Sequence, residues 1–151
     1  MRRHDRKISD SEAFKILQKG EYGILSMITS NNSGYGIPLS FAMKNNNVIY
    51  FHCAIEGSKL GYLKNNNNVS FCVVGNTEVL PSKFGTMYES VIVFGYITEV
   101  NGEEKYDALL SIIEKYSGNY IQEGKEYIDK FNDKVKVIKL SITSISGKAR
   151  K

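Results

Sequence analysis

The stretch YFHCAIEGSKLGYLK, residues 50–64, brings together side chains that could bind an anion or transfer a proton. A strand-like run ends near His52, and Gly57, Ser58 and Lys59 follow directly before a short helical pattern. If Ser58 caps that helix, its hydroxyl, the Lys59 ammonium and the unpaired N–H groups of the first turn converge on one point. Phosphate is the natural ligand of such a point, and Gly57 would let the backbone approach it closely.

The residues alone leave a second interpretation open at each of these positions. The turn also fits a capped surface helix with a solvated lysine, since the P-loop pattern GxxxxGK[ST] does not occur. His52 could give a hydrogen bond or a proton to a substrate, or it could be a half-buried histidine bonded to a backbone carbonyl. No cluster of Cys, His, Asp and Glu has metal-site spacing, so we expect no metal.

The composition is that of a globular domain. The 151 residues are 42% hydrophobic and 24% charged, with a formal net charge of +4, which predicts a single domain over residues 1–151. The charge is too small and too dispersed to indicate nucleic-acid binding. No apolar run of about 18 residues and no signal peptide is present, so we expect no membrane span and a cytoplasmic protein. There, Cys53 and Cys72 would be reduced, buried thiols.

Strand patterns separated by short turns must position these side chains. A helix is expected from the capping box at Ser9 and Glu12 to Gly20, and further helices over 59–64, 101–117 and 122–132. Pro38 indicates an edge strand and Gly95 a bulge, and a longer loop is expected over 76–87. Six strands in all, with peripheral helices, predict a mainly β fold built as a small antiparallel barrel. The strands are expected over residues 22–29, 35–44, 48–53, 69–75, 88–100 and 134–145.

Six segments, spread over nearly the full length of the chain, follow one another in a recognisable order. They are MRRHDR with ISD, GEYGILSM, YGIPLSF, IYFHCAIEGSKLGYLKNNNNVSF, YESVIVFGYITEV and SGKA. In these segments and their order, the chain resembles the FMN-binding split-barrel superfamily of pyridoxamine 5′-phosphate oxidase. Within it, the sequence is most similar to the branch of 5-nitroimidazole resistance proteins.

The resemblance implies a homodimer of six-stranded antiparallel split β-barrels with an FMN at each of two interface sites. His52 would be the catalytic residue, beside the reactive part of the flavin. Glu89 and Ser90 would reach the flavin of the partner subunit, although related oxidases carry roughly arginine-glutamine-valine there, so that match is positional. The implied cofactor-binding residues are Pro38, Leu39, Ser40, Phe51, His52, Cys53, Ala54, Gly57, Ser58, Lys59, Leu60, Glu89 and Ser90.

The activity implied is that of an FMN-dependent oxidoreductase that passes electrons to a small-molecule acceptor, such as a nitroaromatic. The C-terminus, ISGKARK, lacks the arginine-rich segment that would bind the phosphate of a pyridoxamine substrate, which argues against vitamin B6 oxidation. The alternative is a non-catalytic module that stores or senses flavin, or binds haem with His52 as axial ligand.

Overall fold

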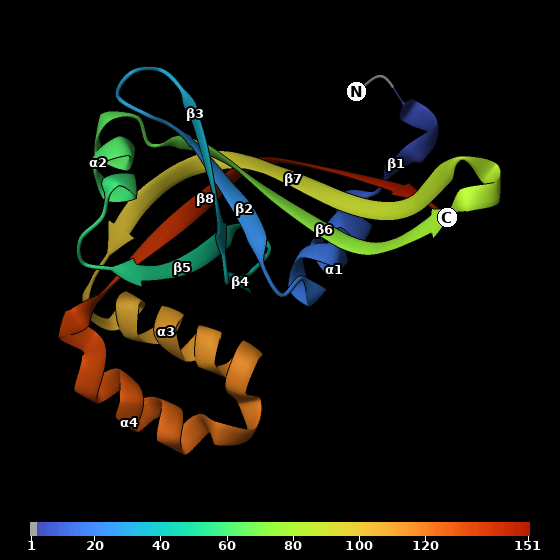
Figure 1. The fold of residues 1–151 in the computed structure, drawn as a ribbon. Coiled ribbons are helices and arrows are strands. Elements are labelled where there is room, and N and C mark those ends of the chain that lie inside the picture. Colours follow the sequence, from blue (N-terminus) through green and yellow to red (C-terminus); the bar gives the residue numbers. More distant parts are fainter. Residues whose placement is uncertain (1–2) are drawn as a thin grey trace.

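One antiparallel sheet of eight strands forms the body of the protein in the computed structural model, which describes residues 3–151 (Figure 1). Its order is β3-β2-β6-β7-β8-β5-β4, with β1 beside β8. The predicted mainly β, antiparallel split-barrel class is confirmed. The strands are β1 (Lys7–Ile8), β2 (Gly23–Ile28), β3 (Gly34–Leu39), β4 (Ala42–Lys44), β5 (Val48–Ala54), β6 (Asn68–Leu80), β7 (Gly85–Val100) and β8 (Val135–Arg150).

The predicted number of six strands is wrong, for two reasons. The two-residue strand β1 is too short to leave a periodic signal in the sequence. The single strand expected over 35–44 is broken at Ser40 and Phe41, so that β3 pairs with β2 whereas β4 pairs with β5. Pro38 lies on β3, an outermost strand of the sheet, as its missing N–H requires.

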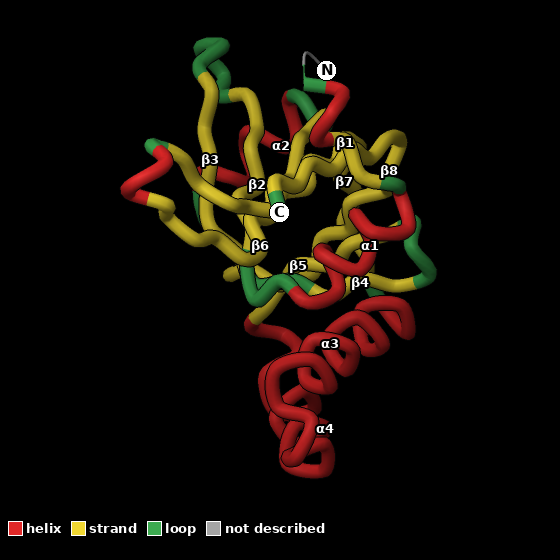
Figure 2. The backbone as a smooth tube through the Cα atoms, turned by 90° about the vertical axis from the view of Figure 1, so that its right-hand side faces the viewer, coloured by secondary structure: helices red, strands yellow, loops and turns green. Residues whose placement is uncertain are grey.

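The two ends of the sheet follow one another in the chain. β3 ends at Leu39 and β4 begins at Ala42, yet they are the first and last strands of the ladder. The strands curl around a shared interior without closing it by hydrogen bonds (Figure 2). We call this opening, between β3 and the free edge of β5, the seam.

The β6–β7 hairpin is longer than the sequence patterns indicate. The loop expected over 76–87 is wrong, because β6 continues through a register shift between Val74 and Thr77 and pairs with β7 as far as Leu80 and Gly85. Only the short 3₁₀ turn η2 (Pro81–Lys83) and Phe84 join the strands. The hairpin therefore extends from the body as an arm, opposite the end of the molecule where the helices α3 (Gly102–Ser117) and α4 (Ile121–Phe131) lie (Figure 1).

Four α-helices surround the sheet: α1 (Asp10–Lys19), α2 (Ser58–Asn65), α3 (Gly102–Ser117) and α4 (Ile121–Phe131). The predicted capping box is confirmed: the Glu12 N–H donates to the Ser9 hydroxyl, and the Ser9 N–H donates to the Glu12 carboxylate at 3.0 Å. The further 3₁₀ turns are η1 (His4–Arg6), η3 (Gly118–Tyr120) and η4 (Asn132–Lys134). None of the helices within residues 3–151 is long and apolar enough to span a membrane.

Two apolar cores hold these layers together. Inside the barrel, the rings of Phe41 and Phe51 pack edge-to-face against Phe71, with centroids 4.9 and 5.0 Å apart. A second core lies between the outer face of the sheet and the α3–α4 hairpin, around Tyr50 and Val137. The expected bulge at Gly95 is confirmed by the register shift between Phe94 and Gly95 in the β7–β8 pairing. A Cβ at Gly95 would lie only 2.0 Å from the Ser141 carbonyl oxygen, so the backbones approach too closely for a side chain.

Candidate functional site

The seam leaves two strand edges free for a ligand. β5 is paired with β4 only from Val48 to Tyr50, so Phe51 to Ala54 have β8 on one side and no strand on the other. β3 has β2 as its single partner. If the β4–β5 register continued, Ser40 would lie opposite His52, but the ladder ends at Ala42. The predicted segments 38–40 and 51–54 therefore flank one opening and present backbone donors and acceptors to it.

The side chains of these two segments divide between the core and the outside. Phe51 is fully buried and Cys53 is 5% exposed, so only their main-chain atoms can contact a cofactor. His52 and Ala54 alternate with them onto the outer face and are exposed, as are Pro38 and Ser40. Three further residues of the predicted cofactor site have half-buried side chains: Leu39, Lys59 and Leu60. The two leucines pack against the barrel core.

The turn after β5 places a helix start beside the seam, but its cap differs from the prediction. Gly57, not Ser58, is the N-cap residue of α2, and no side chain caps the helix. Gly57 has φ 144°, a conformation that a side chain would strain, and the helix therefore starts one residue early. The Leu60 N–H donates to the Gly57 carbonyl at 3.2 Å, which leaves the N–H groups of Ser58 and Lys59 for a ligand.

Lys59 also acts on its neighbours electrostatically. The pKa of His52 is lowered, first by burial of part of the ring among protein atoms and second by the positive charge of Lys59. The imidazole is exposed on one side, so the pKa of His52 is lowered by protein atoms that cover only part of the ring. Burial raises the pKa of the free Cys53 and Cys72 thiols, and Lys59 partly opposes this at Cys53. Cys53 is buried as expected, whereas Cys72 is only half-buried.

His52 lies at the rim of an apolar pocket under the helical hairpin. The pocket has a volume of about 110 Å³, and we call it the α3–α4 pocket. The hairpin is held over it by Glu104, which accepts hydrogen bonds from the Tyr50 hydroxyl at 2.9 Å and from Lys139 at 2.8 Å. Besides His52, the residues that line the α3–α4 pocket are Leu109, Ile112, Ile113, Tyr127, Ile128, Phe131, Asn132 and Val135.

The corner between β3 and β4 is held by a residue that the sequence did not single out. The Tyr116 hydroxyl accepts the Phe41 N–H at 2.9 Å and lies 2.5 Å from the Glu21 carbonyl oxygen and 3.0 Å from that of Phe41. Its one proton can serve either carbonyl. Beside it, the Lys115 ammonium lies 3.6 Å from the centroid of the Phe41 ring, and burial lowers its pKa to about 8. No sequence pattern signals these contacts, because they join residues 74 to 95 positions apart in the chain.

Replacing Tyr116 with Phe should lower the free energy of unfolding by about 1–3 kcal/mol, because the Phe41 N–H loses its acceptor at a part-buried corner. Urea denaturation of the parent and the variant measures this difference. Tyr120→Phe is the matched control, since Tyr120 is 62% exposed, and its effect should stay within about 0.5 kcal/mol. Equal effects of the two variants would show that the hydroxyl does not hold the corner.

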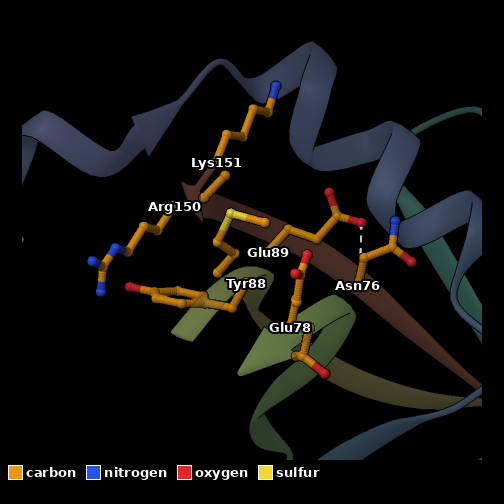
Figure 3. Close-up of a pocket in the computed structure, with 9 residues that line it drawn as sticks. Asn76, Glu78, Tyr88, Glu89, Arg150 and Lys151 are labelled. Carbon is orange, nitrogen blue, oxygen red and sulfur yellow. Dashed lines mark hydrogen bonds between the residues drawn. The ribbon is translucent and has the colours of Figure 1, made fainter. Parts of the chain in front are cut away.

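Glu89 and Ser90 lie far from the seam. Glu89 lines a different surface pocket (Figure 3). This pocket, of about 390 Å³, lies at the base of the arm, and Glu89, Arg150 and Lys151 contribute to its lining. The Glu89 carboxylate accepts the Asn76 N–H at 3.2 Å, the dashed line in Figure 3.

The strand register shows how far apart the two groups of predicted residues are. Along β8, Val137 is paired with His52 and Ala149 with Glu89. Twelve residues of strand separate these partners, about 40 Å at the rise of an extended chain. One chain therefore cannot bring Glu89 and Ser90 to the seam. Within residues 3–151, no three His, Cys, Asp or Glu side chains gather as a metal site.

Comparison with known proteins agrees with this architecture. A family model described as "Pyridoxamine 5'-phosphate oxidase" matches residues 9–149. No curated protein matches the sequence significantly.

Solved structures are similar in fold. A proposed 5-nitroimidazole antibiotic resistance protein from Bacteroides thetaiotaomicron has 22% identity and a TM-score of 0.75, with 94% of this chain and 85% of that chain covered. An FAD-binding protein from Mesorhizobium loti has 21% identity and a TM-score of 0.68, with 97% of each covered. An FAD and heme binding protein from Mycobacterium smegmatis has 14% identity and a TM-score of 0.84, with 97% and 74% covered.

Proposed function

The chain belongs to the pyridoxamine 5′-phosphate oxidase family of split barrels, and we propose that it is an FMN-dependent oxidoreductase. The observation that carries the proposal is the seam, where two free strand edges lie beside the start of α2, whose N-cap residue is Gly57. In this proposal, the backbone of 38–40 and 51–54 lies along the flavin, and the N–H groups of Ser58 and Lys59 hold its phosphate. The free thiols of Cys53 and Cys72 fit a reducing compartment such as the cytoplasm.

The flavin would supply the electron transfer, and the chain would supply binding, orientation and a proton. His52 has an exposed imidazole at the edge of the seam, so it can hold a proton for a small acceptor such as a nitroaromatic. Its lowered pKa makes the protonated ring a stronger acid, which helps proton donation.

We further propose that the flavin lies between two copies of the chain. About 40 Å of strand separates Glu89 and Ser90 from the seam of their own chain. They can therefore reach only the seam of a partner chain. The sheet also exposes an apolar surface, which we call the outer patch, with side chains 38–59% accessible. A twofold dimer that covers it would bury more than about 2,000 Å² in total, as obligate dimers do. The outer patch comprises Ile24, Val74, Ile92, Phe94 and Tyr96.

A second candidate is a non-catalytic module that binds flavin or haem. It is favoured by the likeness to the FAD and heme binding protein and by His52, whose lowered pKa leaves a neutral imidazole available as an axial ligand. The absorption spectrum of the purified protein distinguishes the two ligands, and mass spectrometry identifies the one that co-purifies. Oxidation of a reduced nicotinamide with a nitroaromatic acceptor then separates an oxidoreductase from a storage protein. A haem spectrum, or FMN without turnover, would overturn the proposed activity.

Replacing Lys59 with Ala should weaken FMN binding by about 10- to 150-fold. The variant loses a charge-assisted contact to the phosphate, worth about 1.5–3 kcal/mol. Titration of the apoprotein, followed by flavin fluorescence, measures the change.

Riboflavin provides the control because it has no phosphate, and it should bind the variant and the parent almost equally. Lys64→Ala, at the other end of α2, is the matched charge control and should leave FMN affinity within about threefold of the parent. Equal losses of riboflavin and FMN affinity in Lys59→Ala would contradict the phosphate role.

A further inference from the structure

The tip of the β6–β7 arm carries an aromatic ring that nothing in the described chain covers. Phe84 is 99% exposed and has φ 48°, in the left-handed region. A bulky residue rarely adopts this conformation, which glycine or asparagine would occupy with less strain. Val79, on the same arm, is 68% exposed. Full exposure and an unfavourable backbone both cost free energy, and a partner that covers the ring would offset them.

At the opposite end of the molecule, the α3–α4 pocket offers an apolar surface. Its volume of about 110 Å³ is about three-quarters of the roughly 150 Å³ of an apolar cavity that holds benzene. The pocket is accessible at its rim, where Tyr127 is 60% exposed and Asn132 is half-buried. Phe84 cannot enter the pocket of its own chain, because the arm and the helical hairpin lie at opposite ends of the sheet (Figure 1).

A second copy of the chain brings the two together, if the dimer proposed above exists. In that dimer, the part of β7 that carries Glu89 in one chain lies near the seam of the other chain. The two β7 strands therefore run antiparallel across the outer patch. Ile92 of this patch lies eight residues from Phe84 and eight residues from Val100. A twofold axis that crosses β7 at Ile92 would place Phe84 opposite the partner's Val100. Val100 is paired with Val137, two residues from Val135 in the pocket lining.

We propose that Phe84 of each subunit inserts into the α3–α4 pocket of the other, so that the two arms clamp the dimer. This inference rests on the proposed dimer and names the contact that completes it. The occupant of the pocket is then the second copy of this chain, and a small aromatic ligand is the competing occupant. The contact would also cover the apolar side of His52, which lines the same pocket.

The first test is the dissociation constant of the full-length dimer, measured by analytical ultracentrifugation. Phe84→Gly removes the ring and suits the left-handed backbone, so the variant should fold. We expect the dissociation constant to rise by at least about 30-fold, as at an interface hot spot. Lys83→Ala, in the same exposed turn, is the matched control and should change it less than about threefold. A dimeric parent that Phe84→Gly leaves unchanged would overturn the clamp but not the proposed dimer.

The second test identifies the pocket. In a Cys72→Ser background, Phe84→Cys and Asn132→Cys chains carrying different tags are co-expressed and oxidised. We expect a disulfide between the two tagged chains. Tyr120→Cys, at the far end of the same helical hairpin and about 18 Å away along α4, replaces Asn132→Cys in the control and should not cross-link.

The remaining outcomes are also decisive. A weakened dimer without the Asn132 cross-link would mean that the ring binds elsewhere, which overturns the pocket assignment. Benzene could bind the α3–α4 pocket with equal affinity in the parent dimer and in Phe84→Gly. That result would show that the Phe84 ring does not occupy the pocket and that the pocket is a ligand site. A parent that is monomeric with its flavin bound would overturn the proposed dimer and the clamp together.

Discussion

Replacing His52 with Asn or Gln should lower turnover of a nitroaromatic acceptor by about 10²-fold or more, while FMN affinity falls less than about tenfold. Both replacements keep a hydrogen-bonding group of similar reach but remove the titrating proton. The affinity changes little because ring burial and phosphate contacts provide most of the binding of a flavin. Steady-state kinetics with saturating FMN measure the rate, and equilibrium titration measures the affinity.

The pH dependence gives an independent signature of the same role. A proton donor must be protonated, and the His52 pKa is lowered from its ordinary value of 6.5 by burial and then by Lys59. The parent rate should therefore fall as pH rises through a pKa below 6.5, and the His52→Asn variant should lack this dependence. In Lys59→Ala, loss of the nearby charge should move the fall toward higher pH. Full turnover of His52→Asn with an unchanged pH profile would make His52 a structural residue.

Replacing Phe94 with Asp should raise the dimer dissociation constant by about 10³-fold or more and abolish retention of FMN at micromolar protein. Phe94 is 52% exposed at the centre of the outer patch on β7. Near a twofold axis, the variant would bury two unpaired carboxylates close to each other, and both desolvation and repulsion oppose this. FMN would be lost because each proposed site takes Glu89 and Ser90 from the partner.

Light scattering and the flavin absorbance after gel filtration measure the two effects. The barrel core should be unaffected, since the ring points away from it, so circular dichroism should match that of the parent. Tyr120→Asp introduces the same charge at an exposed aromatic residue on η3 and should remain dimeric and yellow. A Phe94→Asp protein that stays dimeric would show that the outer patch is not the interface.

Local patterns in the sequence predicted most of the elements correctly. The α1 helix follows from the Ser9 and Glu12 capping box. The strand predicted over 48–53 follows from its short apolar run, and the structure extends it by one residue to Ala54. The prediction of a loop over 76–87 was wrong because β6 continues to pair with β7 beyond the register shift between Val74 and Thr77, as far as Val79 and Leu80. No periodicity in the sequence reveals such a shift. The cap of α2 moved by one residue because Gly57 can adopt a backbone conformation that other residues avoid.

The order of strand, Gly57, Ser58, Lys59 and helix could also be predicted from the chain alone, since neighbours in the chain and hydrogen bonds within one turn are sufficient for that. Which side chains reach the seam depends instead on the tertiary structure. Tyr116 holds the corner that separates β3 from β4, and β8 keeps Glu89 about 40 Å of extended chain from the partner of His52. Pairing and packing between residues far apart in the chain set these positions, and such contacts leave no periodic signal in either segment alone.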